Sequence, residues 1–181
     1  MIDNEADDAY RNQVKLNYQF SSWAGQTKVG NSNVRLLDFR IESEDLQGWK
    51  LEEKEELPPG TRQQRVFRYI HSPARESSNQ RYVSTIFECS SVFDAHETLI
   101  DVVMTYMARK LPRCETRGLE IGDICFGSHG EVNLSVIFAR FNILVEIQSA
   151  IPGPAPVNAF AGAVDSLILS RYSRNKESHE G

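Results

Sequence analysis

The sequence predicts a single α+β domain, an antiparallel sheet of about seven to eight strands with two helices packed on it. Three observations lead to this fold class. Apolar and polar residues alternate along several short stretches, which is the period of half-buried strands. Two longer stretches, at 94–111 and 156–172, repeat their apolar residues at helical spacing instead. The 181 residues, 40% hydrophobic and 25% charged, suffice for one core.

Residues 131–150 carry the strongest pattern and predict a central β-hairpin. Apolar residues occupy even positions in the first half and odd positions in the second, so the chain is expected to reverse direction between them. A two-residue loop at 140–141 would set Phe138 opposite Ile143. A four-residue loop ending at Asn142 keeps this pairing and offers a residue that tolerates a left-handed conformation. One long strand with a bulge is the alternative, because a bulge also shifts the phase.

Two further strands are expected near the N-terminus. Alternation from Val14 to Phe20 predicts the first, and residues 33–41 predict a second, less regular strand. Trp23 lies between them and is expected to be a lid over the edge of the core.

The ends of the chain differ in composition from its middle. Polar and acidic residues dominate the start, and polar residues dominate the last stretch. The sequence therefore predicts three parts: a flexible leader at 1–12, a single α+β domain at 13–172 and a frayed tail at 173–181.

A second hairpin is predicted around Pro58-Pro59-Gly60. A three-residue loop there would create two apolar and two oppositely charged pairs across the strands, each of which stabilises an antiparallel pair. These pairs are Trp49 with Tyr69, Leu51 with Phe67, Glu53 with Arg65, and Glu56 with Arg62. A loop one residue longer would oppose like charges, so the three-residue register is favoured.

The next segments predict a loop, a strand and a helix. Residues 72–80 have the composition of a surface loop, and residues 81–91 alternate as a strand with Val83, Thr85, Phe87 and Cys89 on one face. Asp94 and Glu97 form a possible capping box at the start of the helix, which ends before Pro112. The residues expected to face water on this helix are Glu97, Thr98, Asp101, Thr105 and Arg109.

The second half of the chain repeats this plan, because a strand at 119–127 and the central hairpin precede a closing helix. That helix begins near Pro156, and its buried stripe comprises Val157, Phe160, Ala161, Val164, Leu167 and Ile168. The chain therefore reads as two possible βββα units, at 48–111 and 118–172. This strand order resembles that of antiparallel sandwiches such as the PsbP and Mog1-like folds, although no motif identifies a family and fold alone would not fix function.

Composition narrows the possible partners and locations. A net charge of −5 does not favour nucleic-acid binding, so no nucleic-acid partner is expected. No segment has the length of apolar residues that a membrane span needs. If Met1 is the native start the chain is expected to be cytoplasmic, and if a signal peptide was removed it is exported. The three cysteines are interpreted as reduced core thiols, with one disulfide and one free thiol as the alternative for an exported protein.

No motif predicts a cofactor or a metal. The glycines match no phosphate-binding loop, and the cysteines and histidines lack the spacing of a zinc site. Asp123, Cys125 and His129 lie close in sequence and invite a catalytic interpretation. Cys125 shares the parity of Leu119 and Ile121, however, which favours a small buried core residue.

Three arginines, Arg68, Arg75 and Arg81, are the candidate contact residues. Arg62 and Arg65 are expected to pair with glutamates across their hairpin, whereas these three can fork a carboxylate or phosphate of a partner. The function that the sequence favours is a non-enzymatic protein-interaction module with another protein as partner.

Two other functions stay open at this point. One is a small-ligand carrier with a pocket between sheet and helices, lined by Trp49, Tyr69, Phe87 and Met104. The other is an enzyme that uses Cys125 and His129. The sequence sets no oligomeric state.

Overall fold

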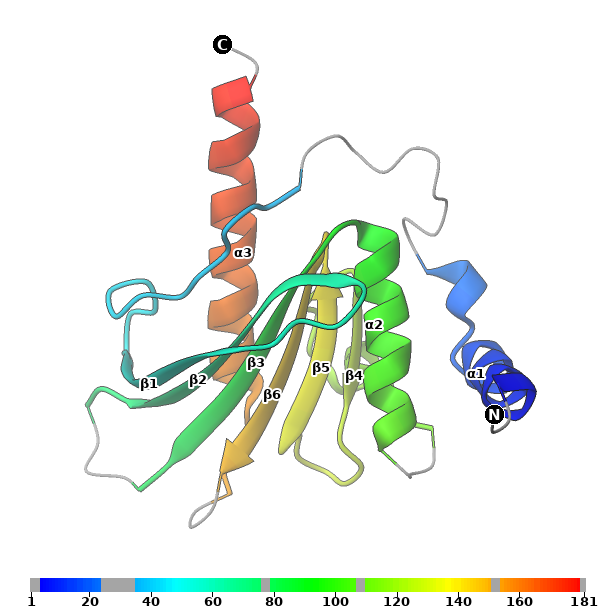
Figure 1. Cartoon of the computed structure of the whole chain (residues 1–181). Helices are drawn as coiled ribbons and strands as arrows, with labels where there is room; N and C mark the ends of the chain where they lie inside the picture. Colours follow the sequence, from blue (N-terminus) through cyan, green and yellow to red (C-terminus); the bar gives the residue numbers. More distant parts are fainter. Residues whose placement is uncertain (1–3, 24–34, 76–78, 107–109, 151–153, 180–181) are drawn as a thin grey trace.

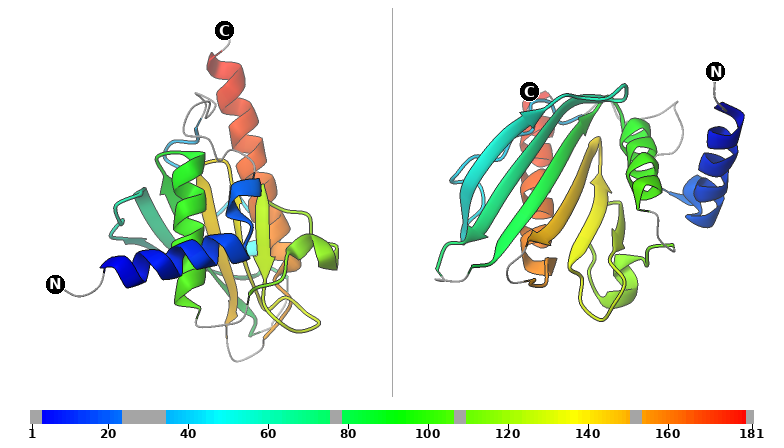
Figure 2. Two further views of the ribbon diagram at one scale, coloured as in Figure 1. Left: turned by 90° about the vertical axis from the view of Figure 1, so that its right-hand side faces the viewer. Right: turned by 60° about the horizontal axis from the view of Figure 1, so that its bottom comes forward.

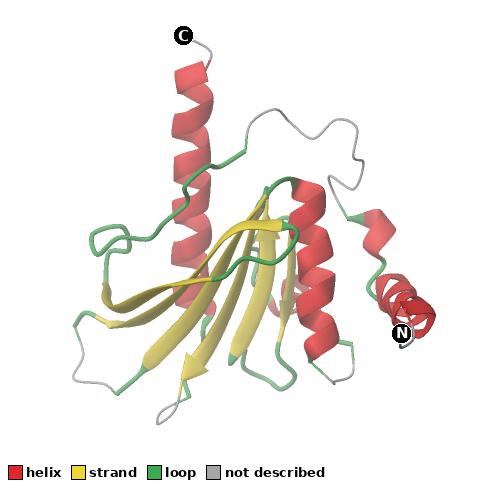
Figure 3. Cartoon of the chain, in the orientation of Figure 1, coloured by secondary structure: helices red, strands yellow, loops and turns green. Residues whose placement is uncertain are grey.

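The computed structural model describes residues 4–23, 35–75, 79–106, 110–150 and 154–179. Its helices are α1 (Asn4–Asn17), η1 (Phe20–Ser22), α2 (Val92–Thr105), η2 (Cys114–Arg117) and α3 (Asn158–His179), of which η1 and η2 are short 3-10 helices. Its strands are β1 (Trp49–Leu57), β2 (Gln63–Pro73), β3 (Arg81–Cys89), β4 (Ile124–Gly127), β5 (Ser135–Arg140) and β6 (Ile143–Ala150). The predicted α+β class is confirmed, with six strands and three α-helices among these residues in place of seven to eight strands and two helices (Figure 3).

All six strands form one antiparallel sheet in the order β1-β2-β3-β6-β5-β4. Two three-stranded meanders thus meet where β3 pairs with β6, and each meander is followed in the chain by a helix. This element order is the repeated βββα plan that the sequence predicted, and its origin by duplication stays a prediction.

The sheet separates two apolar clusters. Helix α3 covers one face together with the segment 35–46, and α2 covers part of the other face, with α1 packed outside it (Figures 1 and 2). The α3-side cluster includes Phe39, Tyr69, Phe138, Phe160 and Ile168. The α2-side cluster includes Tyr18, Trp23, Leu99, Phe126 and Leu144. Successive residues of a strand point to opposite faces, so each central strand serves both clusters.

The central hairpin exists, which excludes the single bulged strand, but its register differs from the prediction by two residues. Phe138 lies opposite Val145, and a two-residue loop of Phe141 and Asn142 joins the strands. Phe141, with φ of 55°, takes the left-handed conformation expected of Asn142. Stacking of its ring on Tyr172 of α3 accompanies this conformation. A shift of two residues leaves each side chain on its predicted face of the sheet, so the alternating apolar residues of the hairpin still face the α3-side cluster.

The strand predicted at 14–20 is wrong, because these residues belong to α1 and η1. Alternation every second residue also contains the i, i+4 spacing of a helix. Val14 and Tyr18 use that spacing to reach the α2-side cluster, while Leu16 stays 73% exposed. Residues 4–12, expected to be a flexible leader, are the first part of this helix. Arg11 fixes the helix by ion pairs to Glu97 and Asp101 of α2.

No strand forms at 35–41, where the sequence predicted one. Phe39 and Ile41 are buried, but neighbouring side chains rather than a strand receive the main-chain groups of this segment. Asn142 binds both the N–H and the C=O of Leu36, and the Tyr69 hydroxyl accepts the N–H of Ile41. Trp23, expected to be a lid at the core edge, is buried within the α2-side cluster.

The predicted register of the hairpin at 49–70 is also wrong. Leu57 pairs with Val66 and Leu51 with His71, so the connection is longer than the three residues around Gly60. The two arginines expected to pair across the hairpin bind other parts of the molecule instead. Arg62 contacts Asp101 of α2, and Arg65 contacts Asp38.

Helix α2 begins earlier than predicted. Its N-cap is Ser91, whose hydroxyl accepts the N–H of Asp94 and donates to that carboxylate. Glu97 and Thr98, which were expected to face water, are buried; Arg109 lies outside the described residues. Glu97 is compensated by Arg11 and Lys15 of α1.

The second half departs from the prediction at three places. The strand expected at 119–127 is present only as β4. Cys114 and Cys125 form a disulfide and Cys89 is a buried free thiol, so the interpretation of three reduced thiols was wrong and one pair with one free thiol is found. In α3 the whole predicted stripe is buried, but residues 173–179, expected to fray, are helical. They extend beyond the sheet (Figure 1).

Candidate functional site

An uncovered area of the sheet beside α2 carries two polar hollows that share Arg68, and we call this area the Arg68 face. It comprises Glu53 and Glu55 of β1, Arg68 and Ile70 of β2, Val83 and Thr85 of β3, and Glu146 and Gln148 of β6. The register brings them together, because Glu55, Arg68, Thr85 and Glu146 lie in one row across the four strands. The hollow in front of Arg68 and Glu146 measures about 290 Å³.

Two contacts with α2 frame this face. Beyond the end of the helix, the Tyr106 hydroxyl donates to the Glu146 carboxylate, and the Gln148 amide donates to the same oxygen at 2.8 Å. At the tip of the β1–β2 hairpin, Arg62 binds Asp101 at 2.7 Å. The hairpin bends toward α2 in front of the sheet (Figure 1), so the sheet surface between hairpin and helix is concave.

Charge is distributed unevenly over the Arg68 face. Within the described part of the chain, Arg68 makes no hydrogen bond or ion pair, although it is exposed and lies across from Glu55. Glu53 and Glu55 likewise have no cationic partner among those residues. Burial and the hydrogen bond to Glu146 raise the pKa of Tyr106, so its hydroxyl stays a donor at neutral pH. The face therefore offers one free guanidinium flanked by carboxylates.

The structure separates the three arginines that the sequence singled out. Arg68 projects from the uncovered face. Arg81 lies on that face too, but Glu52 binds it at 3.1 Å. Arg75 is exposed in the turn after β2, next to residues 76–78, which lie outside the described residues. Arg68 is thus the arginine that belongs to a shaped site.

Sequence reasoning missed Tyr106, Glu146 and Gln148, which complete this site. Glu146 lies opposite Ile137 of β5. Its approach to Arg68 depends on the pairing of β3 with β6, which joins residues far apart in sequence. Tyr106 was missed because the predicted helix continued past it to 111, whereas α2 ends at Thr105.

The Cys125 and His129 constellation does not assemble as a nucleophile and base in this structure. Cys125 is buried and bonded to Cys114, so it has no free thiol. Asp123 instead receives Arg140 and the N–H of Phe141, which holds the turn of the central hairpin. Among the described residues, no group of three or more His, Cys, Asp or Glu side chains could hold a metal ion.

The four residues expected to line a carrier pocket lie on opposite faces of the sheet. Trp49 and Tyr69 pack in the α3-side cluster, whereas Phe87 and Met104 pack against the α2-side cluster. They do not line one pocket.

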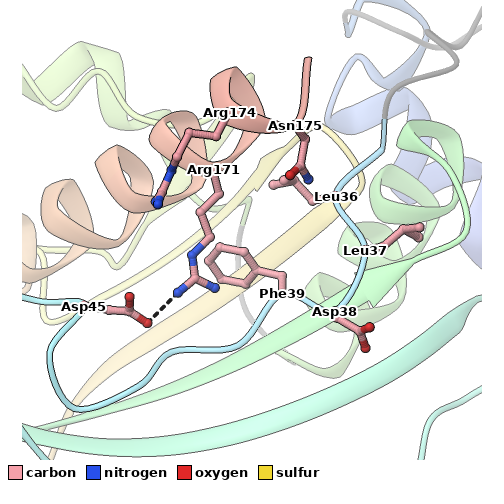
Figure 4. A pocket seen from close by; sticks show the side chains of 8 residues that line it. All are labelled: Leu36, Leu37, Asp38, Phe39, Asp45, Arg171, Arg174 and Asn175. Atoms are coloured by element: carbon pink, nitrogen blue, oxygen red, sulfur yellow. Dashed lines mark hydrogen bonds and ion pairs between the residues drawn. The ribbon is translucent and has the colours of Figure 1, made fainter. Parts of the chain in front are cut away.

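A second hollow, of about 360 Å³, lies between the segment 36–45 and α3 (Figure 4). Its central cation, Arg171, already binds Asp45 at 2.5 Å and lies over the Phe39 ring. This arginine also donates to the C=O of Arg40. The hollow thus surrounds a structural anchor that ties the segment to the helix.

The fold and the site define an α+β protein in which two meanders share one sheet and leave a polar surface open beside α2. Neither a protein-family model, nor a curated protein, nor a solved structure matches the chain. The likeness in strand order to the PsbP and Mog1-like sandwiches therefore stays a prediction. None of the described helices is both long and apolar enough to cross a membrane.

Proposed function

We propose that this chain is a non-enzymatic protein-binding module and that the Arg68 face contacts its partner. The observation that carries the proposal is the exposed Arg68 guanidinium, which has no ionic partner among the described residues and lies on a concave sheet surface. A guanidinium can bind a carboxylate through two parallel hydrogen bonds, which gives direction as well as affinity.

The surroundings of Arg68 restrict the partner. Glu53 and Glu55 lie beside it and repel a purely acidic surface, whereas a surface that places one carboxylate between basic side chains matches all three groups. Arginine in a concave, water-excluding contact is among the residues that contribute most to binding. Tyr106 and Gln148 hold Glu146 in place, so part of the face is ordered before binding.

Native mass spectrometry of the protein recovered gently from its source cells tests this proposal. The wild-type chain is expected to carry the added mass of a second polypeptide. Arg68→Glu should reduce the bound fraction at least about tenfold, since it removes a charge-assisted contact and adds repulsion. Lys176→Glu makes the same change of charge at an exposed position of α3 and should leave the complex intact.

Two results would overturn the proposal. One is a bare monomer from the source cells. The other is a complex that survives Arg68→Glu as well as it survives Lys176→Glu.

A further inference from the structure

Strand β1 is an open edge of the sheet. It pairs with β2 on one side. Within the described part of the chain, its main chain makes one further backbone hydrogen bond, from the N–H of Trp49 at its start to the C=O of Leu46, and none from Glu53 to Leu57. Lys54 as a whole residue is exposed, yet its side chain is only 27% accessible. Its main-chain atoms therefore contribute much of the exposed area, as expected of an edge strand. Glu52, with a side chain 25% accessible, behaves in the same way.

The opposite edge of the sheet is different. Strand β4 has four residues, all of them buried, and the preceding chain covers it. Arg113 forms a bridge with Phe126, and the N–H of Gly127 donates to the C=O of Pro112. The nine-residue β1 is therefore the edge at which another strand can be added.

Charge on β1 selects the kind of strand that fits. Glu42 neutralises Lys54, and Arg81 neutralises Glu52. Glu53, Glu55 and Glu56 are exposed and have no cationic partner among the described residues. Two copies of this edge would set carboxylates against carboxylates, which disfavours pairing of the protein with itself. A basic strand would meet the opposite charge at each of these positions.

The backbone of β1 is suited to pairing over its second half. The irregularity in its ladder lies between Leu51 and Glu53, and the pairs from Glu53 to Leu57 are regular. On an added strand, the residues opposite Glu53 and Glu55 would share one face and stand two positions apart. Basic side chains at alternate positions would therefore reach both carboxylates.

We propose that β1 binds an extended segment of a partner protein, with lysine or arginine at alternate positions, as a seventh strand of the sheet. This inference rests on the proposed function and adds the chemistry of the partner segment. Main-chain hydrogen bonds supply affinity in such a contact, and the alternating cations supply selectivity.

A synthetic peptide with the nine-residue length of β1, alternating lysine and threonine, tests the inference. A peptide alternating lysine and proline has the same charge but lacks half of the main-chain donors, and one alternating glutamate and threonine has the opposite charge. Fluorescence anisotropy is expected to give a dissociation constant at least about tenfold lower for the lysine–threonine peptide than for either control. Amide hydrogen exchange should slow in β1 when that peptide binds.

Two double variants with the same change of net charge distinguish binding at the β1 edge from general electrostatic attraction to the protein. The double substitution Glu53→Lys and Glu55→Lys should weaken binding of the lysine–threonine peptide at least about tenfold. Glu120→Lys with Glu131→Lys changes the net charge equally at exposed positions distant from β1 and should weaken it less than about threefold.

Three results would overturn the inference: no binding of the lysine–threonine peptide, equal binding of the lysine–proline peptide, or unchanged exchange in β1. These results are independent of the Arg68→Glu experiment. A complex that is lost in Arg68→Glu, together with unchanged amide exchange in β1, would retain the binding module and remove the added strand.

Discussion

At the scale of single residues, two buried histidines contribute to the dependence of stability on pH. His71 is 1% exposed and lies between the rings of Tyr69 and Phe160, and neither of its ring nitrogens has a hydrogen-bond partner among the described residues. Burial lowers its pKa from 6.5 to about 4. Burial likewise lowers the pKa of His96 to about 4, against smaller opposing effects of Asp123 and Glu97. Both therefore stay neutral in the folded protein at pH values where the unfolded chain is protonated.

The sign of the effect follows from these values. Above pH 6.5 neither the folded nor the unfolded state protonates His71, so pH has no effect through this group. As pH falls from 6.5 toward 4, the unfolded state gains a proton that the folded state does not bind, and stability decreases. The loss through His71 reaches at most about 3 kcal/mol and levels off below its folded pKa.

His71→Phe should therefore flatten part of this dependence. The phenyl ring suits the aromatic surroundings and removes two unpaired polar atoms, so we expect the variant to be at least as stable as the wild type at neutral pH. Urea denaturation across the acid range measures the slope of the free energy of unfolding against pH.

Tyr69→Phe is the matched control in the same cluster. It removes the hydrogen bond to Ile41, and burial raises the pKa of Tyr69 to about 12, so the group does not titrate in acid. Its stability curve should lie below the wild type by a constant amount. If the free energy of unfolding of His71→Phe and of the wild type changed equally with pH, His71 would not be a source of the acid-range loss of stability.

At the scale of elements, side-chain hydrogen bonds rather than strand pairing attach the segment that begins at 35 to the sheet. Asn142 is 1% exposed in the turn between β5 and β6, and its amide donates to the C=O of Leu36 and of Cys89 at 2.9 and 3.0 Å. Its oxygen accepts the N–H of Leu36 at 2.9 Å. One residue thus joins the central hairpin, the end of β3 and the segment that begins at 35.

Asn142→Ala should lower the free energy of unfolding by about 3 kcal/mol, because three hydrogen bonds are lost and their main-chain partners stay buried. Chemical denaturation measures the loss, and amide exchange at Leu36 should accelerate more than in the sheet. Asn17→Ala removes an exposed hydrogen bond to Gln13 and should cost less than about 0.5 kcal/mol. If both variants lost the same free energy of unfolding, the hydrogen bonds of Asn142 would not be what anchors this segment.

Helices and strands were predicted correctly where the spacing of apolar residues in the sequence matches the face that is buried in the structure. The strand at 81–89, the parity of the central hairpin and the stripe from Val157 to Ile168 follow from burial on a fixed period. Val14 to Phe20 fits both periods, but the helix is held on Glu97 and Asp101 by Arg11 and Lys15, which lie 82 to 90 residues away in sequence. Local sequence contains no record of such contacts, and for this reason the helix was missed.

The candidate site shows the same limit. Arg68 and Arg81 were both expected to be available to a partner, but Glu52, which lies at the irregularity in β1, binds Arg81. The hairpin register was mistaken because the charges of Arg62 and Arg65 found partners in α2 and near Asp38. A pairing argument confined to one hairpin cannot include partners from elsewhere in the chain.

At the scale of the whole molecule, the two βββα halves share one sheet. The β3–β6 pair joins them along eight residue pairs, and its side chains alternate between the two clusters, with Leu144 on one side and Val145 on the other. Neither cluster can lose its packing without disturbing the strands that support the other. We therefore expect the predicted domain at 13–172 to unfold as one cooperative unit.

The two tryptophans can test this, because each reports on one cluster. Trp23 packs against Phe126 and His96 on the α2 side, and Trp49 packs against Tyr82 and Phe160 on the α3 side. Trp49→Phe leaves the first reporter and Trp23→Phe leaves the second. Within each variant, the urea midpoint from tryptophan fluorescence should coincide with the midpoint from far-ultraviolet circular dichroism.

Coincidence in both variants means that the two faces of the sheet unfold together, although each substitution lowers the midpoint itself. Trp49 belongs to β1 at the open edge of the sheet, so separate unfolding would first be seen there. A fluorescence midpoint for Trp49 below the circular-dichroism midpoint would show that the outer strands β1 and β2 detach before the centre. Such a result would divide the chain into a stable β3–β6 core and a labile binding edge.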